Sequence, residues 1–79
     1  MMRARKRKTL GYAICMRNTG FAASLEVRKL YAVLVDVQAD ADGLIRVIDE
    51  SGEDYLYPAD FFQRVTLPAE IQRALQLAS

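Results

Sequence analysis

Residues 44–58, LIRVIDESGEDYLYP, contain two short apolar runs on either side of an acidic stretch with one glycine. Both runs are rich in β-branched and aromatic residues, which fit the pleated, half-buried surface of a strand. Two such runs separated by a few residues that include glycine are typical of a β-hairpin. We therefore expect an antiparallel hairpin whose strands are residues 44–48 and 55–57.

The turn of this hairpin determines how its two strands pair. A turn centred on Glu50 and Ser51, with Gly52 in the left-handed conformation, makes a three-residue connection with a bulge. The resulting opposite pairs are Val47 with Tyr55 and Ile45 with Tyr57. Because opposite residues of a strand pair lie on the same side of the sheet, all four side chains are expected on one face.

The segments around the hairpin predict the rest of the fold. Residues 10–17, 30–36 and 62–66 are expected to be strands, because they are short, largely apolar and bounded by turn residues. Pro68 suits the first turn of a helix, and the apolar residues that follow it recur at helical spacing. We expect a mainly β protein, a small five-stranded antiparallel barrel with one tight helical turn near 58–61 and a C-terminal helix near 68–77. Its expected core consists of Val33, Val35, Ile45, Val47, Tyr57 and Phe62.

The composition indicates one small acidic domain with a basic leader. The chain has 79 residues, and its hydrophobic content of 52% is ample for a core. Residues 1–8 hold five basic residues and no acid, so we expect a disordered leader ahead of a single domain over residues 9–79. That domain carries six basic and ten acidic residues. No apolar run reaches the roughly 20 residues that span a bilayer, and Cys15 has no partner for an internal disulfide. We therefore expect a cytoplasmic protein that does not enter a membrane.

The acidic residues resemble two kinds of metal site without fitting either. The acids of residues 49–54 fall at the hairpin tip, where turn carboxylates splay outward, so we expect them to be solvated and independent. Residues 38–49 follow the spacing of a calcium loop, but Gln38 stands where the first aspartate is needed and Asp49 where a longer glutamate is needed. We therefore expect no metal site, and a plain Asp-Gly turn at residues 42–43.

The chain lacks the residues on which most catalysis depends. It has no histidine, which removes the commonest general base and metal ligand. Cys15 has neither a histidine nor a second cysteine to activate it. The four glycines are scattered and form no phosphate-binding loop. We therefore expect a protein without enzyme activity and without a cofactor.

Residues 52–62, GEDYLYPADFF, resemble the end of a Src-homology-3-like barrel. In that fold a glycine turn leads through a strand to a proline, one tight helical turn and the last strand. More broadly, residues 12–77 resemble a group of short bacterial proteins of unknown function. The resemblance implies the fold and no activity. It places Leu56, Pro58 and Phe61 at outward, protein-binding positions and Tyr57 and Phe62 in the core, although core packing is an open alternative for Phe61 and Tyr55.

Two functions from different classes fit these features. The preferred one is a protein-interaction module that offers an apolar patch to an unknown protein partner or, weakly, to its own copy. The acidic loops would favour a basic partner. The alternative is a nucleic-acid-associated protein whose leader contacts phosphates. Its binding residues would be Arg3, Arg5, Lys6, Arg7 and Lys8.

Overall fold

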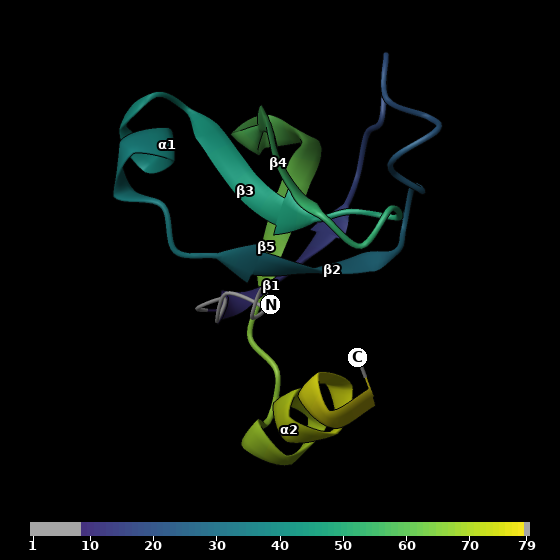
Figure 1. Cartoon of the computed structure of the whole chain (residues 1–79), viewed down its shortest axis with the longest axis vertical. Helices are drawn as coiled ribbons and strands as arrows, with labels where there is room; N and C mark the ends of the chain where they lie inside the picture. The colour runs from purple at the N-terminus through teal and green to yellow at the C-terminus, as the bar shows by residue number, and fades with distance from the viewer. Residues whose placement is uncertain (1–8, 79) are drawn as a thin grey trace, which may run out of the picture.

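The computed structural model of the chain describes residues 9–78 and consists of one antiparallel sheet and three short helices (Figure 1). The expected leader, residues 1–8, lies outside the described residues. The sheet has five strands in the order β4-β3-β2-β1-β5. The strands are β1 (Thr9–Cys15), β2 (Leu30–Leu34), β3 (Leu44–Ile48), β4 (Asp54–Pro58) and β5 (Phe62–Val65).

The hairpin of β3 and β4 has the predicted register. Val47 pairs with Tyr55 and Ile45 pairs with Tyr57. The amide of Asp49 donates to the carbonyl of Glu53 over 3.0 Å, which closes a three-residue turn. Gly52 has a φ of +86°, a left-handed conformation that residues with a Cβ adopt at a cost. The predicted turn chemistry therefore accounts for the pairing.

The connection from β2 to β3 contains a helix that the sequence pattern did not predict. Helix α1 (Val37–Ala41) is capped by Asp36, whose carboxylate accepts a hydrogen bond of 3.0 Å from the amide of Ala39. Such a cap satisfies one of the backbone donors left free at a helix start. The helix ends before Gly43, which has a φ of +74°. The connection is thus a short capped helix followed by a turn at Gly43.

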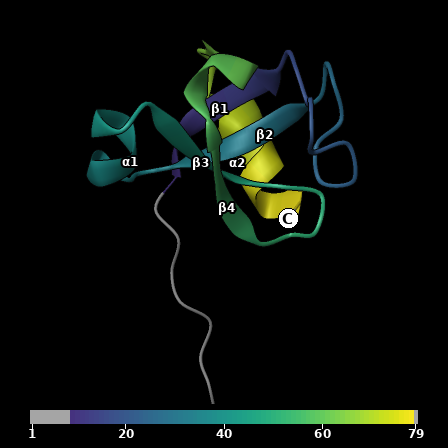
Figure 2. The ribbon, with the colours of Figure 1, turned by 90° about the horizontal axis from the view of Figure 1, so that it is seen from above.

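The two other helices lie close to where they were predicted. The 3₁₀ helix η1 (Ala59–Phe61) follows β4 directly and leads into β5. Helix α2 (Ala69–Ala78) follows β5 after a short connection that contains Pro68. It lies on the far side of β1 and β2 when the molecule is seen from above (Figure 2). Its residues Ile71 and Leu75 are exposed.

The core fills the other face of the sheet. Five of the six predicted core residues are buried, and Val47 is fully enclosed. Val35 is 44% exposed, so its assignment to the core is wrong: β2 ends at Leu34, and the chain then turns into α1. The buried cluster consists of Ala13, Cys15, Leu25, Tyr31, Val33, Ile45, Val47, Tyr57, Phe61 and Phe62.

The described part of the chain is therefore mainly β, with five antiparallel strands in one sheet. The sheet begins at β4 and ends at β5, and these two edge strands are not paired with each other, so the sheet is not closed. Among the described residues, no helix has the length and apolar character needed to cross a membrane.

Val47→Ala tests the packing of this core. Val47 has no exposed surface and lies on β3, between β4 and β2. Removing its two methyl groups is expected to lower the free energy of unfolding by about 1–3 kcal/mol, through lost burial and the cavity left behind. Urea melts of the two proteins measure this difference. An unchanged midpoint would show that Val47 is not enclosed in solution.

Candidate functional site

The hairpin turn holds a buried carboxylate instead of a solvated one. Asp49 is only 6% exposed. One of its oxygens accepts hydrogen bonds from the amide and the hydroxyl of Ser51, over 2.9 and 2.6 Å. The other accepts from the hydroxyl of Tyr57 over 2.5 Å. The side chain thus ties the turn to the core, since Tyr57 is itself buried.

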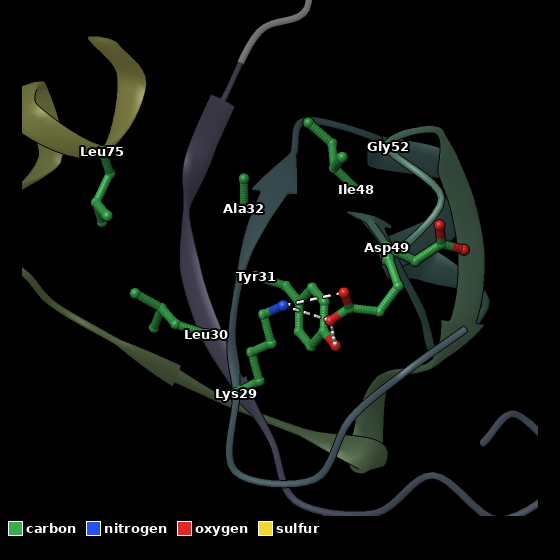
Figure 3. Close-up of a pocket in the computed structure, with 9 residues that line it drawn as sticks. Lys29, Leu30, Tyr31, Ala32, Ile48, Asp49, Gly52 and Leu75 are labelled. Carbon is green, nitrogen blue, oxygen red and sulfur yellow. Dashed lines mark hydrogen bonds and ion pairs between the residues drawn. The ribbon is translucent and has the colours of Figure 1, made fainter. Parts of the chain in front are cut away.

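The next residue, Glu50, ties the turn to the long β1–β2 loop, residues 16–29. Its carboxylate pairs with the ammonium of Lys29 over 2.7 Å and accepts from the hydroxyl of Tyr31 over 2.5 Å. The dashed lines in Figure 3 mark these contacts. Its amide donates to the carbonyl of Ser24 over 3.0 Å. The hydroxyl of Tyr31 also accepts a hydrogen bond from the amide of Glu26 over 2.8 Å. Tyr31 therefore connects Glu26 of the loop to Glu50 of the hairpin turn.

Asp54 is paired as well. Arg46, its neighbour on β3, reaches it over 2.9 Å and also contacts the capping residue Asp36 over 2.7 Å. The expectation that the acids of residues 49–54 are solvated and independent is therefore wrong for Asp49, Glu50 and Asp54. Apart from Ser51, which lies in the same turn as Asp49, their partners come from strands and from a loop that is distant in sequence, and the local sequence does not reveal them.

These contacts change the acidity of the groups. Burial alone would raise the pKa of Asp49, but the hydrogen bonds from Ser51 and Tyr57 outweigh it and hold that pKa below its ordinary value of 3.8. The hydrogen bond from Lys29, followed by the one from Tyr31, lowers the pKa of Glu50 below 4.5. Burial, together with the hydrogen bond to Asp49, raises the pKa of Tyr57 to about 12. Both turn carboxylates are therefore ionised at neutral pH.

Acid is expected to destabilise the fold through these two carboxylates. A group whose pKa is lowered by folding contributes stability that is complete above its unfolded pKa and is lost as the pH falls through its folded pKa. The free energy of unfolding should be nearly constant between about pH 7 and 5, and it should fall below about pH 4. Urea melts across this range measure the slope, and Asp49→Asn should make it shallower. An Asp49→Asn variant with an unchanged slope would contradict the assignment.

A depression opens beside Asp49, between the β1–β2 loop and the hairpin. Its volume is about 350 Å³, and it is lined by Phe21, Ser24, Asp49, Ser51, Tyr55, Leu56 and Tyr57. The ring of Phe21 stands edge-on to that of Tyr57, with 5.0 Å between the centroids. Three large side chains of the lining are still partly exposed: Tyr55 by 52%, Leu56 by 40% and Phe21 by 38%. This combination gives an aromatic surface with hydroxyl groups at its edge.

The structure separates the three residues predicted to bind a protein. Leu56 is exposed and lines the depression, whereas Pro58 is partly buried. Phe61 is only 7% exposed, so the outward position expected for it is wrong and the core alternative holds. Its ring lies 6.1 Å from that of Phe21, and the guanidinium of Arg17 lies 5.0 Å above it. Tyr55 is not in the core, because it lies at the tip end of β4.

Phe21 is the part of this site that sequence reasoning missed. It lies in the β1–β2 loop, more than thirty residues before β4, and reaches the hairpin only because the loop folds over it. A single aromatic residue in a polar segment was the only available signal.

A second depression, of about 280 Å³, lies between α2 and the sheet (Figure 3). Leu75 of α2 faces Leu30 and Ala32 of β2 across it. The Lys29–Glu50 pair lies at its edge.

The sequence also contains residues that were considered for metal, thiol and nucleic-acid chemistry. Within residues 9–78, no three acidic or cysteine side chains converge in a way that could hold a metal ion. Cys15 is buried, and burial raises the pKa of its thiol. The candidate nucleic-acid residues lie outside the described part of the chain: Arg3, Arg5, Lys6, Arg7 and Lys8.

Comparisons with protein-family models, with curated proteins and with solved structures give no match to this chain.

Proposed function

We propose that this protein is a non-catalytic interaction module that binds a partner protein through Phe21, Tyr55 and Leu56. The observation that carries the proposal is that these three large side chains remain exposed around one depression, on a domain that buries most of its other aromatic residues. Aromatic and large aliphatic side chains in a depression are typical anchors of protein interfaces.

We further propose that the domain is a Src-homology-3-like small barrel. The chain order in the structure supports this proposal: the Gly52 turn leads through β4 to Pro58, the 3₁₀ helix and β5. The aromatic residue that follows the helix, Phe62, packs in the core. The depression lies beside the hairpin turn, and its lining includes Leu56 but not Pro58.

The expected partner is basic. The domain has four more acidic than basic residues, and the exposed acid Glu26 lies on the β1–β2 loop that borders the depression. Complementary charge of this kind accelerates the approach of a partner more than it holds the complex together. An experiment must also distinguish binding of a partner protein from weak self-association of this chain. Nothing in the described part of the chain favours nucleic-acid binding.

Site-specific photo-cross-linking tests the proposal. A photoreactive phenylalanine analogue replaces Tyr55 in one protein and the exposed residue Val37 of α1 in a matched control. We expect a discrete protein adduct in native cells from position 55 and none from position 37. Mass spectrometry then identifies the partner, or a second copy of this chain, and purified components confirm the binding. Equal labelling from both positions, or none from either, would overturn the proposal.

A further inference from the structure

Two tyrosine–carboxylate pairs lie next to each other at the hairpin turn. The consecutive residues Asp49 and Glu50 each accept a hydrogen bond of 2.5 Å from a buried tyrosine, Tyr57 for the first and Tyr31 for the second. Each pair therefore brings one negative charge to the edge of one aromatic ring.

The Glu50 pair is completed by a cation. The ammonium of Lys29 lies 2.7 Å from the carboxylate and 5.9 Å from the centroid of the Tyr31 ring. A cation in that position interacts with both the charge and the face of the ring. Lys29 comes from the β1–β2 loop, so this set also fixes the loop.

No residue in the described part of the chain supplies a cation to the Asp49 pair. Among residues 9–78, the ion pairs involve Lys29, Arg46 and Arg64, and none of these reaches Asp49. Its donors are a backbone amide and two hydroxyl groups, all uncharged. Asp49 is the more buried of the two acids, and a buried charge is normally paired.

The depression borders on this carboxylate. Asp49 belongs to its lining together with Tyr55 and Phe21, two aromatic side chains that are partly exposed. A carboxylate offers about four acceptor positions, and three are used here, so one remains. The lining of the depression therefore combines a negative charge with aromatic surface.

Resting on the proposed function, we infer that this depression receives an arginine side chain of the partner protein, which supplies to Asp49 the positive charge that Lys29 supplies to Glu50. A guanidinium is planar, so it stacks on an aromatic ring while its edge donates to a carboxylate. It is also less strongly hydrated than an ammonium, which favours it at a buried acid. A divalent metal ion needs several oxygen ligands, and a single carboxylate does not supply them.

Titration of the ¹⁵N-labelled full chain with two short peptides tests this inference. One peptide is acetyl-Gly-Ala-Arg-Ala-Gly-amide, and the other carries citrulline, a neutral analogue of similar shape, in place of arginine. We expect saturable shifts of the amide signals of Ser24, Ser51 and Tyr55, with a dissociation constant on the order of millimolar because a single side chain is bound. Citrulline should bind at least about tenfold more weakly, since the buried charge is then left unpaired.

Matched variants separate a specific site from general attraction. Asp49→Asn and Glu53→Gln each remove one charge from the same turn, and the side chain of Glu53 is exposed. Asp49→Asn should abolish saturation, Tyr55→Ser should weaken binding about tenfold, and Glu53→Gln should leave it nearly unchanged. The spectrum of each free variant shows whether it is folded.

Equal binding of both peptides, or equal losses in Asp49→Asn and Glu53→Gln, would overturn the arginine site. If cross-linking at position 55 captures a partner but the arginine peptide does not bind, this inference fails while the proposed function holds. If neither is observed, both fail.

Discussion

Phe61→Ser is expected to lower the free energy of unfolding by about 3–5 kcal/mol, the range found for loss of a buried aromatic side chain. Phe61 belongs to the buried cluster, and its ring contacts that of Phe21 and lies beneath the guanidinium of Arg17. A domain of this size has a total stability on the order of 5 kcal/mol. A large fraction of the variant should therefore be unfolded at room temperature.

Circular dichroism and a urea melt measure this effect, with Leu56→Ser as the matched control. Leu56 is much more exposed than Phe61, so the control should lose less than about 1 kcal/mol. Similar midpoints for the two variants would show that Phe61 is not part of the core. The outward anchor position implied by the family resemblance would then be restored.

Asp49→Ala is expected to destabilise the protein by about 2–4 kcal/mol. The substitution leaves the buried hydroxyl of Tyr57 and the amide of Ser51 without their acceptor. Each buried donor left unpaired costs about 1–3 kcal/mol, and part of this is recovered where water enters. Glu53→Ala, on the same turn, should change the stability by less than about 0.5 kcal/mol because its side chain is exposed.

A double-mutant cycle shows whether the cost arises at the Tyr57 hydroxyl. Tyr57→Phe removes that donor and keeps the ring in the core. If the two groups act on each other, the double variant should be more stable than the sum of the single effects implies, by roughly 0.5–3 kcal/mol. Strictly additive effects would contradict the direct coupling of Asp49 and Tyr57.

Local patterns were sufficient to predict the hairpin. The alternation on both sides of the turn and the single glycine at residue 52 determine the pairs that the structure contains. The C-terminal helix was predicted for a similar reason, since Pro68 suits the first turn of a helix and directly precedes α2. In each case the determining interactions lie within a few residues along the chain.

The burial of Asp49 could not be predicted in this way. A carboxylate at a turn is usually solvated, and its partner Tyr57 becomes apparent only once the strands are paired and the ring is in the core. The same holds for Glu50, whose partners Lys29 and Tyr31 lie at the end of the β1–β2 loop and in β2. Contacts between distant segments thus decide which acids are solvated.

The end of β2 explains one further difference. The apolar run that begins at Leu30 continues through Val35, but Asp36 caps a helix and ends the strand early. A longer strand would have turned Val35 inward, as the alternation alone suggests. Phe21 differs for another reason: its loop has no regular sequence pattern, yet the loop places the Phe21 ring against the hairpin.

The most direct test of the account is a paired measurement on Tyr55→Ser and the control Val37→Ser. Both residues are largely exposed, and only Tyr55 borders the depression. For each variant, a urea melt gives the stability and a titration gives the Kd for the purified partner captured through position 55. Both variants are expected to keep the stability of the parent protein within about 1 kcal/mol. Only Tyr55→Ser should weaken binding, by about tenfold or more. A Tyr55→Ser variant that loses stability but binds as tightly as the control would contradict the binding role of Tyr55.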